Sequence, residues 1–362
     1  MSDTYCTAPF HHIYSDNSGK YRLCCHAQSN KNLKKYSSLS HTPFEYFLSD
    51  EMEQIRQDMI EGKRIDGCQT CYNIEETGNQ SWRQWKYNKR YDHDTYVNRV
   101  GLKLRINGSY CNLSCYMCIP YNSSTRRKEL KDASIDWSKY DSEYLSVHSK
   151  QYDKIIDDIL QHIELIDYMN ITGGEPILLP KHWEMIDAIP KEHAKNITLY
   201  YDTNLTTLEW KDRSIFDIVK KFKDVRLGVS CDHYDEKLSW IRYPIKVDEF
   251  ENNLVIAKDL ISQLNCTVSI LNIHELDDIH HYYKTKFNLE TSFENVVIGP
   301  NILSIKNLPN KKRLLIKHKN NNMIYQELIK ESNQKEYKEG LEYCQKLSDH
   351  RNFQFKNLWT QL

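Results

Sequence analysis

In Cys111-Asn112-Leu113-Ser114-Cys115-Tyr116-Met117-Cys118, three cysteines fall within eight residues, in the spacing C-x3-C-x2-C. One short loop therefore supplies three thiolates. A cubane iron–sulfur cluster that is closed by protein has four cysteine ligands, so three leave one iron open to a small molecule. The alternatives are a zinc knuckle or unrelated buried thiols. The nearest histidines, His93 and His148, lie too far along the chain for the usual zinc spacings.

Strand patterns lie on both sides of this loop. Residues 100–107 alternate apolar and polar positions, with Lys103 and Arg105 as the polar ones, and lead directly into the cysteines. Residues 168–172 predict a second strand, which Gly173-Gly174-Glu175-Pro176 follows at once. Glycines at that point expose backbone groups to a closely approaching ligand, and the carboxylate beside them could hold an amino group. Taken alone, the loop would be an ordinary turn.

The cysteine loop followed by G-G-E-P resembles the radical S-adenosylmethionine (radical SAM) family, whose C-x3-C-x-hydrophobic-C signature it matches in every position. The resemblance implies a [4Fe–4S] cluster on Cys111, Cys115 and Cys118 that binds SAM at its open iron. In the family, an electron from this cluster cleaves SAM into methionine and a 5′-deoxyadenosyl radical. The matching loop receives the amino group of SAM, a role that falls here to Gly173, Gly174 and Glu175.

Two later strand ends resemble the same family. Residues 197–202 end in Thr203-Asn204, as in T-N-G-T, and residues 225–229 end in Ser230-Cys231-Asp232, as in S-x-D-G. Leu205 and His233 stand where glycine is usual, which indicates an altered pocket wall. Arg242 also matches a recurrent arginine of the family. The alternatives are that the polar residues at the strand ends cap helices and that Arg242 forms a surface ion pair. The resemblance implies that SAM contacts Thr203, Asn204, Ser230, Asp232 and Arg242.

Strands and helices alternate through this region, which predicts a parallel sheet with right-handed crossovers. Because there are about six strand–helix units, the fold class expected is α/β, an open, partial (β/α)6 TIM-like barrel. The motifs lie at the carboxyl ends of strands, where α/β barrels place their chemistry. The helices are expected at 152–163, 183–189, 215–222, 250–264 and 279–287, and further strands at 266–271, 296–298 and 303–305.

A second group of cysteines precedes the barrel. The run 19–24 resembles the two-strand turn of SPASM and twitch auxiliary-cluster modules, and Cys71, Glu75, Gly78, Ser81 and Arg83 follow their C-x3-E-x2-G-x2-S-x-R spacing. The resemblance implies a small N-terminal cysteine-rich module with a second, auxiliary [4Fe–4S] cluster. Four cysteines also suit a structural zinc site, and Cys25 or His26 could replace Cys24. The expected ligands are Cys6, Cys24, Cys68 and Cys71.

Length and composition agree with three parts: the auxiliary module at 1–95, the barrel at 96–308 and a helical extension at 309–362. Of the 362 residues 40% are hydrophobic, and the net charge of −1 gives no basis for broad nucleic-acid binding. The basic runs 126–128 and 311–313 are typical of solvated faces. We expect a cytoplasmic protein without a membrane span or signal peptide. Small buried hydrophobes are expected at Cys231, Cys266 and Cys344.

The expected function is a radical SAM enzyme that takes an electron from a flavodoxin- or ferredoxin-type donor and abstracts hydrogen from a substrate. The substrate is expected to be a peptide or a sugar- or nucleoside-type small molecule. The auxiliary cluster would accept an electron or hold the substrate. The alternative is a non-catalytic iron–sulfur or zinc protein that transfers electrons or binds a partner on a degenerate barrel. The sequence identifies neither the reaction nor a general base.

Overall fold

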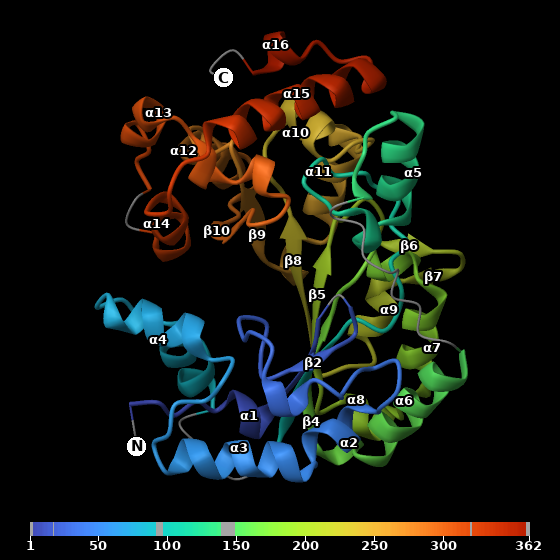
Figure 1. Ribbon diagram of the computed structural model, residues 1–362. Helices are drawn as coiled ribbons and strands as arrows, with labels where there is room; N and C mark the ends of the chain where they lie inside the picture. Colours follow the sequence, from blue (N-terminus) through green and yellow to red (C-terminus); the bar gives the residue numbers. More distant parts are fainter. Residues whose placement is uncertain (1–2, 17, 92–96, 139–148, 319–320, 360–362) are drawn as a thin grey trace. The chain divides into compact units, whose positions relative to one another are not determined.

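A computed structural model describes residues 3–16, 18–91, 97–138, 149–318 and 321–359 (Figure 1). Within these residues the strands form an eight-stranded, mostly parallel sheet, which confirms the α/β class and the barrel-type sheet. The chain divides into two compact units. The first comprises Met1–Gly108, Tyr144–Tyr201 and Ile215–Val225, and the second Ser109–Glu143, Asp202–Ser214 and Arg226–Leu362.

The first unit contains five neighbouring strands in the order β5-β4-β3-β1-β2. Strand β1 pairs antiparallel with β2 and parallel with β3, and β3, β4 and β5 continue in parallel. The N-terminal cysteine-rich region therefore adds β1 and β2 to the strands of the barrel, a feature that the sequence did not predict. Their bounds are β1 (His12–Ser15), β2 (Tyr21–Arg22), β3 (Val100–Leu104), β4 (Ile166–Ile171) and β5 (Thr198–Thr203).

The helices of the first unit begin with clear signals. Helix α3 (Asp50–Ile60) is capped by Ser49, whose side chain accepts the N–H of Met52, and acidic residues fill its first turn, where they favour the helix dipole. Thr42 and Glu45 form a capping box at the start of α2 (Pro43–Phe47). The other helices are α1 (Ala8–His11), α4 (Gln69–Glu76), a π-helix at Arg83–Asn88, α6 (Ser149–Gln161), α7 (Pro180–Ala188), α8 (Lys191–Ala194) and α9 (Ile215–Val219).

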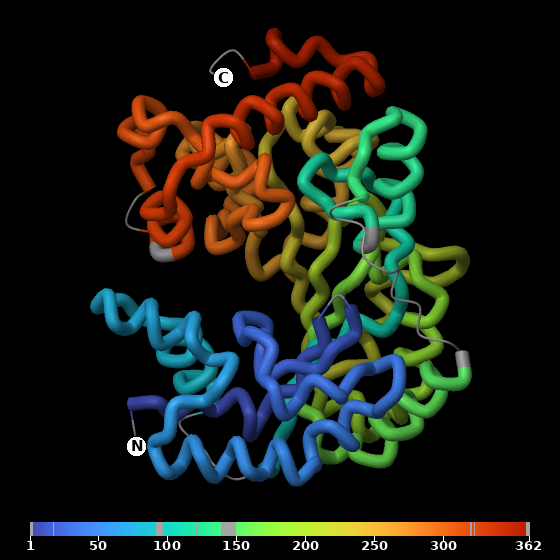
Figure 2. Tube along the Cα trace, viewed as in Figure 1, coloured from blue at the N-terminus to red at the C-terminus, as the bar shows by residue number. Residues whose placement is uncertain are grey.

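The second unit contains three parallel strands, β8 (Asp224–Ser230), β9 (Ile261–Val268) and β10 (Thr291–Val296), and the small hairpin β6 (Glu209–Trp210) with β7 (Arg213–Ser214). In Figure 2 the red C-terminal helix α15 (Gln334–Arg351) runs beside the yellow segment that contains α10 (Asp235–Ile241). The remaining helices are α5 (Ser124–Asp132), α11 (Val247–Ile256), α12 (Leu276–Phe287), α13 (Asn310–Leu314), α14 (Asn322–Leu328) and α16 (Phe355–Leu358).

Four expected elements differ from the structure. The strand predicted over 296–298 lies too late in the chain, because β10 covers Thr291–Val296. The helix predicted over 250–264 ends at Ile256, and β9 begins at Ile261 instead of residue 266. Burial alternates along β9, the period-two signal of a strand, which the preceding helical pattern obscured. The strand predicted over 303–305 is wrong: 3₁₀ turns occupy Asn301–Leu303 and Ile305–Asn307.

The expected boundary between module and barrel, at residues 95 and 96, lies outside the described residues, so the three-part division stays a prediction. Among the described helices, none is long and apolar enough to cross a membrane.

Candidate functional site

The three-cysteine loop has a fixed backbone and accessible thiols. The N–H of Ser114 donates to the carbonyl of Tyr243 at 2.6 Å, and that of Tyr116 donates to Ile241 at 3.0 Å. The Tyr116 ring is buried, and its hydroxyl bonds to Ser269. By contrast, the thiols are half-buried at Cys111, Cys115 and Cys118. These bonds hold the main chain while the sulfurs stay open to a ligand.

Two of the side chains predicted to bind SAM lie against these thiols within the second unit. The Nδ2 of Asn204 lies 3.7 Å from the Cys111 sulfur, and the Nη1 of Arg242 lies 3.7 Å from the Cys115 sulfur. Asp232 pairs with the same arginine, Oδ2 to Nη2, at 2.8 Å. Burial alone would lower the pKa of Arg242, but this carboxylate raises it, so the guanidinium stays cationic. Burial raises the pKa of Cys115 above its ordinary value, and the positive charge of Arg242 opposes that rise.

The polar strand ends also hold their own turns. The Thr203 hydroxyl accepts the N–H of Leu205 at 3.0 Å, and the Asp232 carboxylate accepts the N–H of Thr267 at 2.6 Å. Ser230 is half-buried at the end of β8. Leu205, which stands where the family has glycine, adopts φ +54° and is buried. The turn thus keeps the backbone form that glycine favours.

A buried cluster of two arginines and one glutamate contacts the cysteine loop, and the sequence did not predict it. Arg126 donates to the carbonyl of Cys118 at 3.3 Å and to that of Tyr116 at 3.0 Å. Arg351, from α15, donates to the carbonyl of Ser114 at 2.5 Å. Glu129 forms ion pairs with both arginines. The expectation of a solvated face at 126–128 was therefore wrong for Arg126.

The only sequence signal for this cluster was Arg126 with Glu129 one helical turn later, which is common on solvated helices. Nothing in the C-terminal sequence indicated that Arg351 contacts the cysteine loop, because the two positions are separated by more than two hundred residues.

The G-G-E-P loop belongs to the first unit, at the end of β4. Gly173 and Gly174 have φ +101° and +54°, and a Cβ on Gly173 would lie 3.2 Å from the carbonyl oxygen of Gly108. Glu175 is buried. Glycine is therefore required by the backbone itself at Gly173, in addition to any ligand, whereas the φ of Gly174 is one that Leu205 also adopts.

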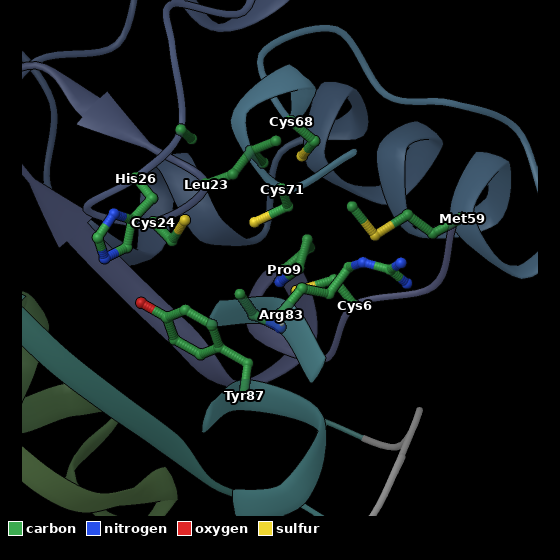
Figure 3. Close-up of a pocket in the computed structure, with 12 residues that line it drawn as sticks. Cys6, Pro9, Leu23, Cys24, His26, Met59, Cys68, Cys71, Arg83 and Tyr87 are labelled. Atoms are coloured by element: carbon green, nitrogen blue, oxygen red, sulfur yellow. Dashed lines mark hydrogen bonds between the residues drawn. The ribbon is translucent and has the colours of Figure 1, made fainter. Parts of the chain in front are cut away.

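Four thiols of the N-terminal region line one small cavity in the first unit, with a volume of about 20 Å³ (Figure 3). In Figure 3 the sulfurs of Cys24 and Cys71 point toward one another across it. Cys25 is exposed and does not line the cavity, whereas His26 does. The cavity thus collects the four predicted cluster ligands, Cys6, Cys24, Cys68 and Cys71.

The four thiols that line the cavity are protonated unless a cation binds to them. Burial, followed by the proximity of the other thiols, raises the pKa of Cys6, Cys24 and Cys68, and burial also raises that of Cys71. Such thiols ionise only when a bound metal compensates their charge, and binding then releases protons. In the described part of the chain, no three His, Cys, Asp or Glu side chains are arranged to hold a single metal ion.

The segment after Cys71 fixes this cavity. Arg83 donates to Glu75 at 3.0 Å and to the carbonyl of Tyr5 at 2.6 Å. The Ser81 hydroxyl also bonds to Glu75. Because Tyr5 precedes Cys6, these bonds join the helix that carries Cys71 to the segment that carries Cys6. Gly78 has φ +79°, which explains the glycine in this spacing.

Comparisons with known proteins place this geometry in context. Residues 108–284 match the family model of the Radical SAM superfamily. A comparison with curated proteins found no significant match.

The solved structures that are similar to the chain include the following three. Native anSMEcpe with bound AdoMet shares 18% identity over 55% of this chain and 53% of its own, with a TM-score of 0.41. Streptococcus suis SuiB bound to S-adenosylmethionine shares 14% over 67% and 51%, with a TM-score of 0.36. TYW1 with a lysine-pyruvate adduct bound shares 16% over 65% and 77%, with a TM-score of 0.34. The chain spans about half the length of the first two.

Proposed function

Because residues 108–284 of this chain carry a radical SAM domain, we propose that the protein is an enzyme that cleaves SAM reductively and removes hydrogen from a substrate. Cys111, Cys115 and Cys118 would hold the SAM-binding [4Fe–4S] cluster. The observation that carries this proposal is the loop itself: three half-buried thiols on a fixed backbone, with side-chain N–H donors at two of the sulfurs.

A bound [4Fe–4S] cluster with SAM supplies one-electron cleavage of the sulfonium, which yields methionine and a 5′-deoxyadenosyl radical. The chain's residues would prepare this chemistry. Asn204 and Arg242 donate to the thiolates, and Glu175, beside Gly173 and Gly174, would hold the amino group of SAM. Thr203, Ser230 and Asp232 would line the rest of its pocket. The electron would come from a flavodoxin- or ferredoxin-type donor.

For the N-terminal cavity we propose an auxiliary [4Fe–4S] cluster on Cys6, Cys24, Cys68 and Cys71. The common cavity supports this assignment, and the exposed position of Cys25 favours Cys24 as the ligand. This cluster would accept an electron from the substrate or hold the substrate, which belongs to the peptide or the sugar- and nucleoside-type class.

The Cys118→Ala variant tests the first assignment. Anaerobically reconstituted protein with dithionite and SAM should form 5′-deoxyadenosine, and Cys118→Ala should form none above background because the cluster loses a ligand. Cys25→Ala, an exposed thiol outside the cavity, serves as the control and should retain the activity. Continued 5′-deoxyadenosine formation by Cys118→Ala would contradict the proposal.

Iron content tests the second assignment. Two cubane clusters correspond to about eight irons per chain, and Cys68→Ala should retain about four. Cys25→Ala should stay near the wild-type value. A wild-type content near four irons after full reconstitution would exclude the auxiliary cluster. One zinc ion per chain that is not replaced by iron during reconstitution would exclude it as well.

A further inference from the structure

A row of polar side chains crosses three strands of the first unit. Tyr14 on β1 lies opposite Lys103 on β3, and Lys103 lies opposite Asn170 on β4. The neighbouring row, Ile13, Leu102 and Met169, is buried in the core. Successive side chains alternate between the faces of a sheet, so the first row occupies the face away from that core.

Arg105 follows Lys103 by two residues and therefore extends the same face. Its backbone N–H donates to the Ser15 hydroxyl at 2.9 Å, so the main chain is fixed independently of the guanidinium. We refer to Tyr14, Lys103, Asn170 and Arg105 as the polar row.

Buried polar atoms on this face lack partners. Asn170 is only 7% exposed, and its Oδ1 has no hydrogen-bond partner in the described part of the chain. The same holds for Nε of Arg105 and for Nε2 of His12, which lies on the Tyr14 side of β1. Folded proteins pair nearly all such atoms, so several orphans on one face point to an absent ligand. The Asn170 amide can turn to present N–H donors instead.

The charge around this face is positive. Burial, followed by Lys103, Arg90 and Lys86, lowers the pKa of His12 to about 3, so its imidazole is neutral. Asp16, the acidic group close to Tyr14, is paired with Arg22 at 2.6 Å and also accepts from Ser18. Cationic side chains are therefore concentrated near the buried polar atoms that lack hydrogen-bond partners.

We propose that the polar row binds an oxyanion of the substrate, a phosphate or carboxylate group, with Arg105 and Asn170 donating hydrogen bonds and Lys103 supplying charge. This inference rests on the proposed function, because it narrows the substrate of that enzyme to an anionic molecule. A guanidinium matches the geometry of both groups, and its charge-assisted hydrogen bonds to them are stronger than neutral ones.

The test is anion binding by the reconstituted full chain without SAM, with inorganic phosphate in one arm and succinate in the other, each against chloride at equal ionic strength. Thermal stabilisation and calorimetry should detect binding. Affinity should fall about tenfold or more in Arg105→Gln, since a charge-assisted hydrogen bond is lost, and also fall in Asn170→Ala. Arg64→Gln, which changes an exposed arginine of the same unit, should bind like wild type.

Stability without ligand separates binding from a structural role. Arg105→Gln should unfold at the same or a higher denaturant concentration than wild type, because Nε of Arg105 has no hydrogen-bond partner among the described residues. Protection by phosphate alone, succinate alone or both identifies the group and supports the site. Binding of neither anion, unchanged binding in both variants, or strong destabilisation by Arg105→Gln would overturn it. Since SAM is absent, failure of SAM cleavage would leave this result untouched.

Discussion

At the scale of single residues, Leu205 shows how a departure from a family pattern is accommodated. The turn after β5 requires φ +54°, and the chain meets this requirement with a leucine that is only 1% exposed. A left-handed backbone costs an L-residue about 1–2 kcal/mol, whereas burial of a leucine side chain contributes about 1.5–3 kcal/mol. Burial therefore offsets the backbone cost, and glycine is not needed.

Truncation at Leu205 separates these two contributions. We expect Leu205→Ala to lose about 2–5 kcal/mol of unfolding free energy, since it keeps the left-handed backbone but loses the buried side chain. Leu205→Gly should be more stable than Leu205→Ala by about 1 kcal/mol, because glycine adopts this φ without strain. Urea unfolding of the three proteins measures both differences. An alanine variant as stable as the glycine variant would show that the turn is not strained.

At the scale of elements, the ion pair between Arg83 and Glu75 gives a physical reason for the C-x3-E-x2-G-x2-S-x-R spacing. From the sequence, this spacing was known only as a resemblance to a family pattern. Both side chains are largely buried, and Arg83 also bonds to the carbonyl of Tyr5. The C-x3-E-x2-G-x2-S-x-R pattern therefore encodes the connection between α4, the π-helix and the Cys6 segment.

Removal of this connection should affect the auxiliary site selectively. Arg83→Gln leaves Glu75 without its partner, and breaking a buried pair costs about 3–5 kcal/mol. We expect lower stability and a reconstituted iron content that falls toward about four per chain. Arg64→Gln is the matched control, because Arg64 and Glu76 are each 56% exposed and such pairs contribute about 1 kcal/mol or less. Equal losses in the two variants would refute the connecting role.

At the scale of the whole molecule, the C-terminal helix helps to hold the cysteine loop. Arg351 contacts Glu129 and the carbonyl groups of Ser114 and Trp240, and the Tyr343 hydroxyl donates to the carbonyl of Tyr116 at 2.6 Å. The helical extension is therefore part of the candidate site of the second unit, although its sequence carries no recognisable motif.

Arg351→Met should destabilise the protein by about 3–5 kcal/mol, since it leaves Glu129 with one cationic partner and removes the two bonds to the carbonyls of Trp240 and Ser114. Lys335→Gln, in the same helix, is the control, because Lys335 is 86% exposed and its ion pair is 4.0 Å long. Denaturant unfolding measures both. A small effect of Arg351→Met, comparable to that of Lys335→Gln, would show that the helix does not hold the loop.

Acid should weaken the same cluster. Burial would raise the pKa of Glu129, but Arg351 and Arg126 lower it below its ordinary value of 4.5. A carboxyl group with a lowered pKa stabilises the folded state above its unfolded pKa, and that contribution disappears as the pH falls through the folded value. The difference in unfolding free energy between wild type and Arg351→Met should therefore shrink as the pH falls from neutral to below 4.5. A constant difference would mean that Glu129 is not charged at neutral pH.

The sequence alone determined the elements whose signals are local. The alternation of residues 100–107 and the glycines after β4 set the strands and the tight turn, because side-chain periodicity and permitted φ values act over a few residues. The C-x3-C-x2-C spacing defined the candidate metal site of the cysteine loop in the same way, whereas Cys6, Cys24 and Cys68 are far apart in the chain and were grouped only by the family resemblance. Tertiary structure alone decided which distant groups meet. The joining of β1 to β3, the contact of Arg351 with the cysteine loop and the unpartnered atoms of the polar row depend on packing between segments far apart in the chain, and no local pattern encodes such packing.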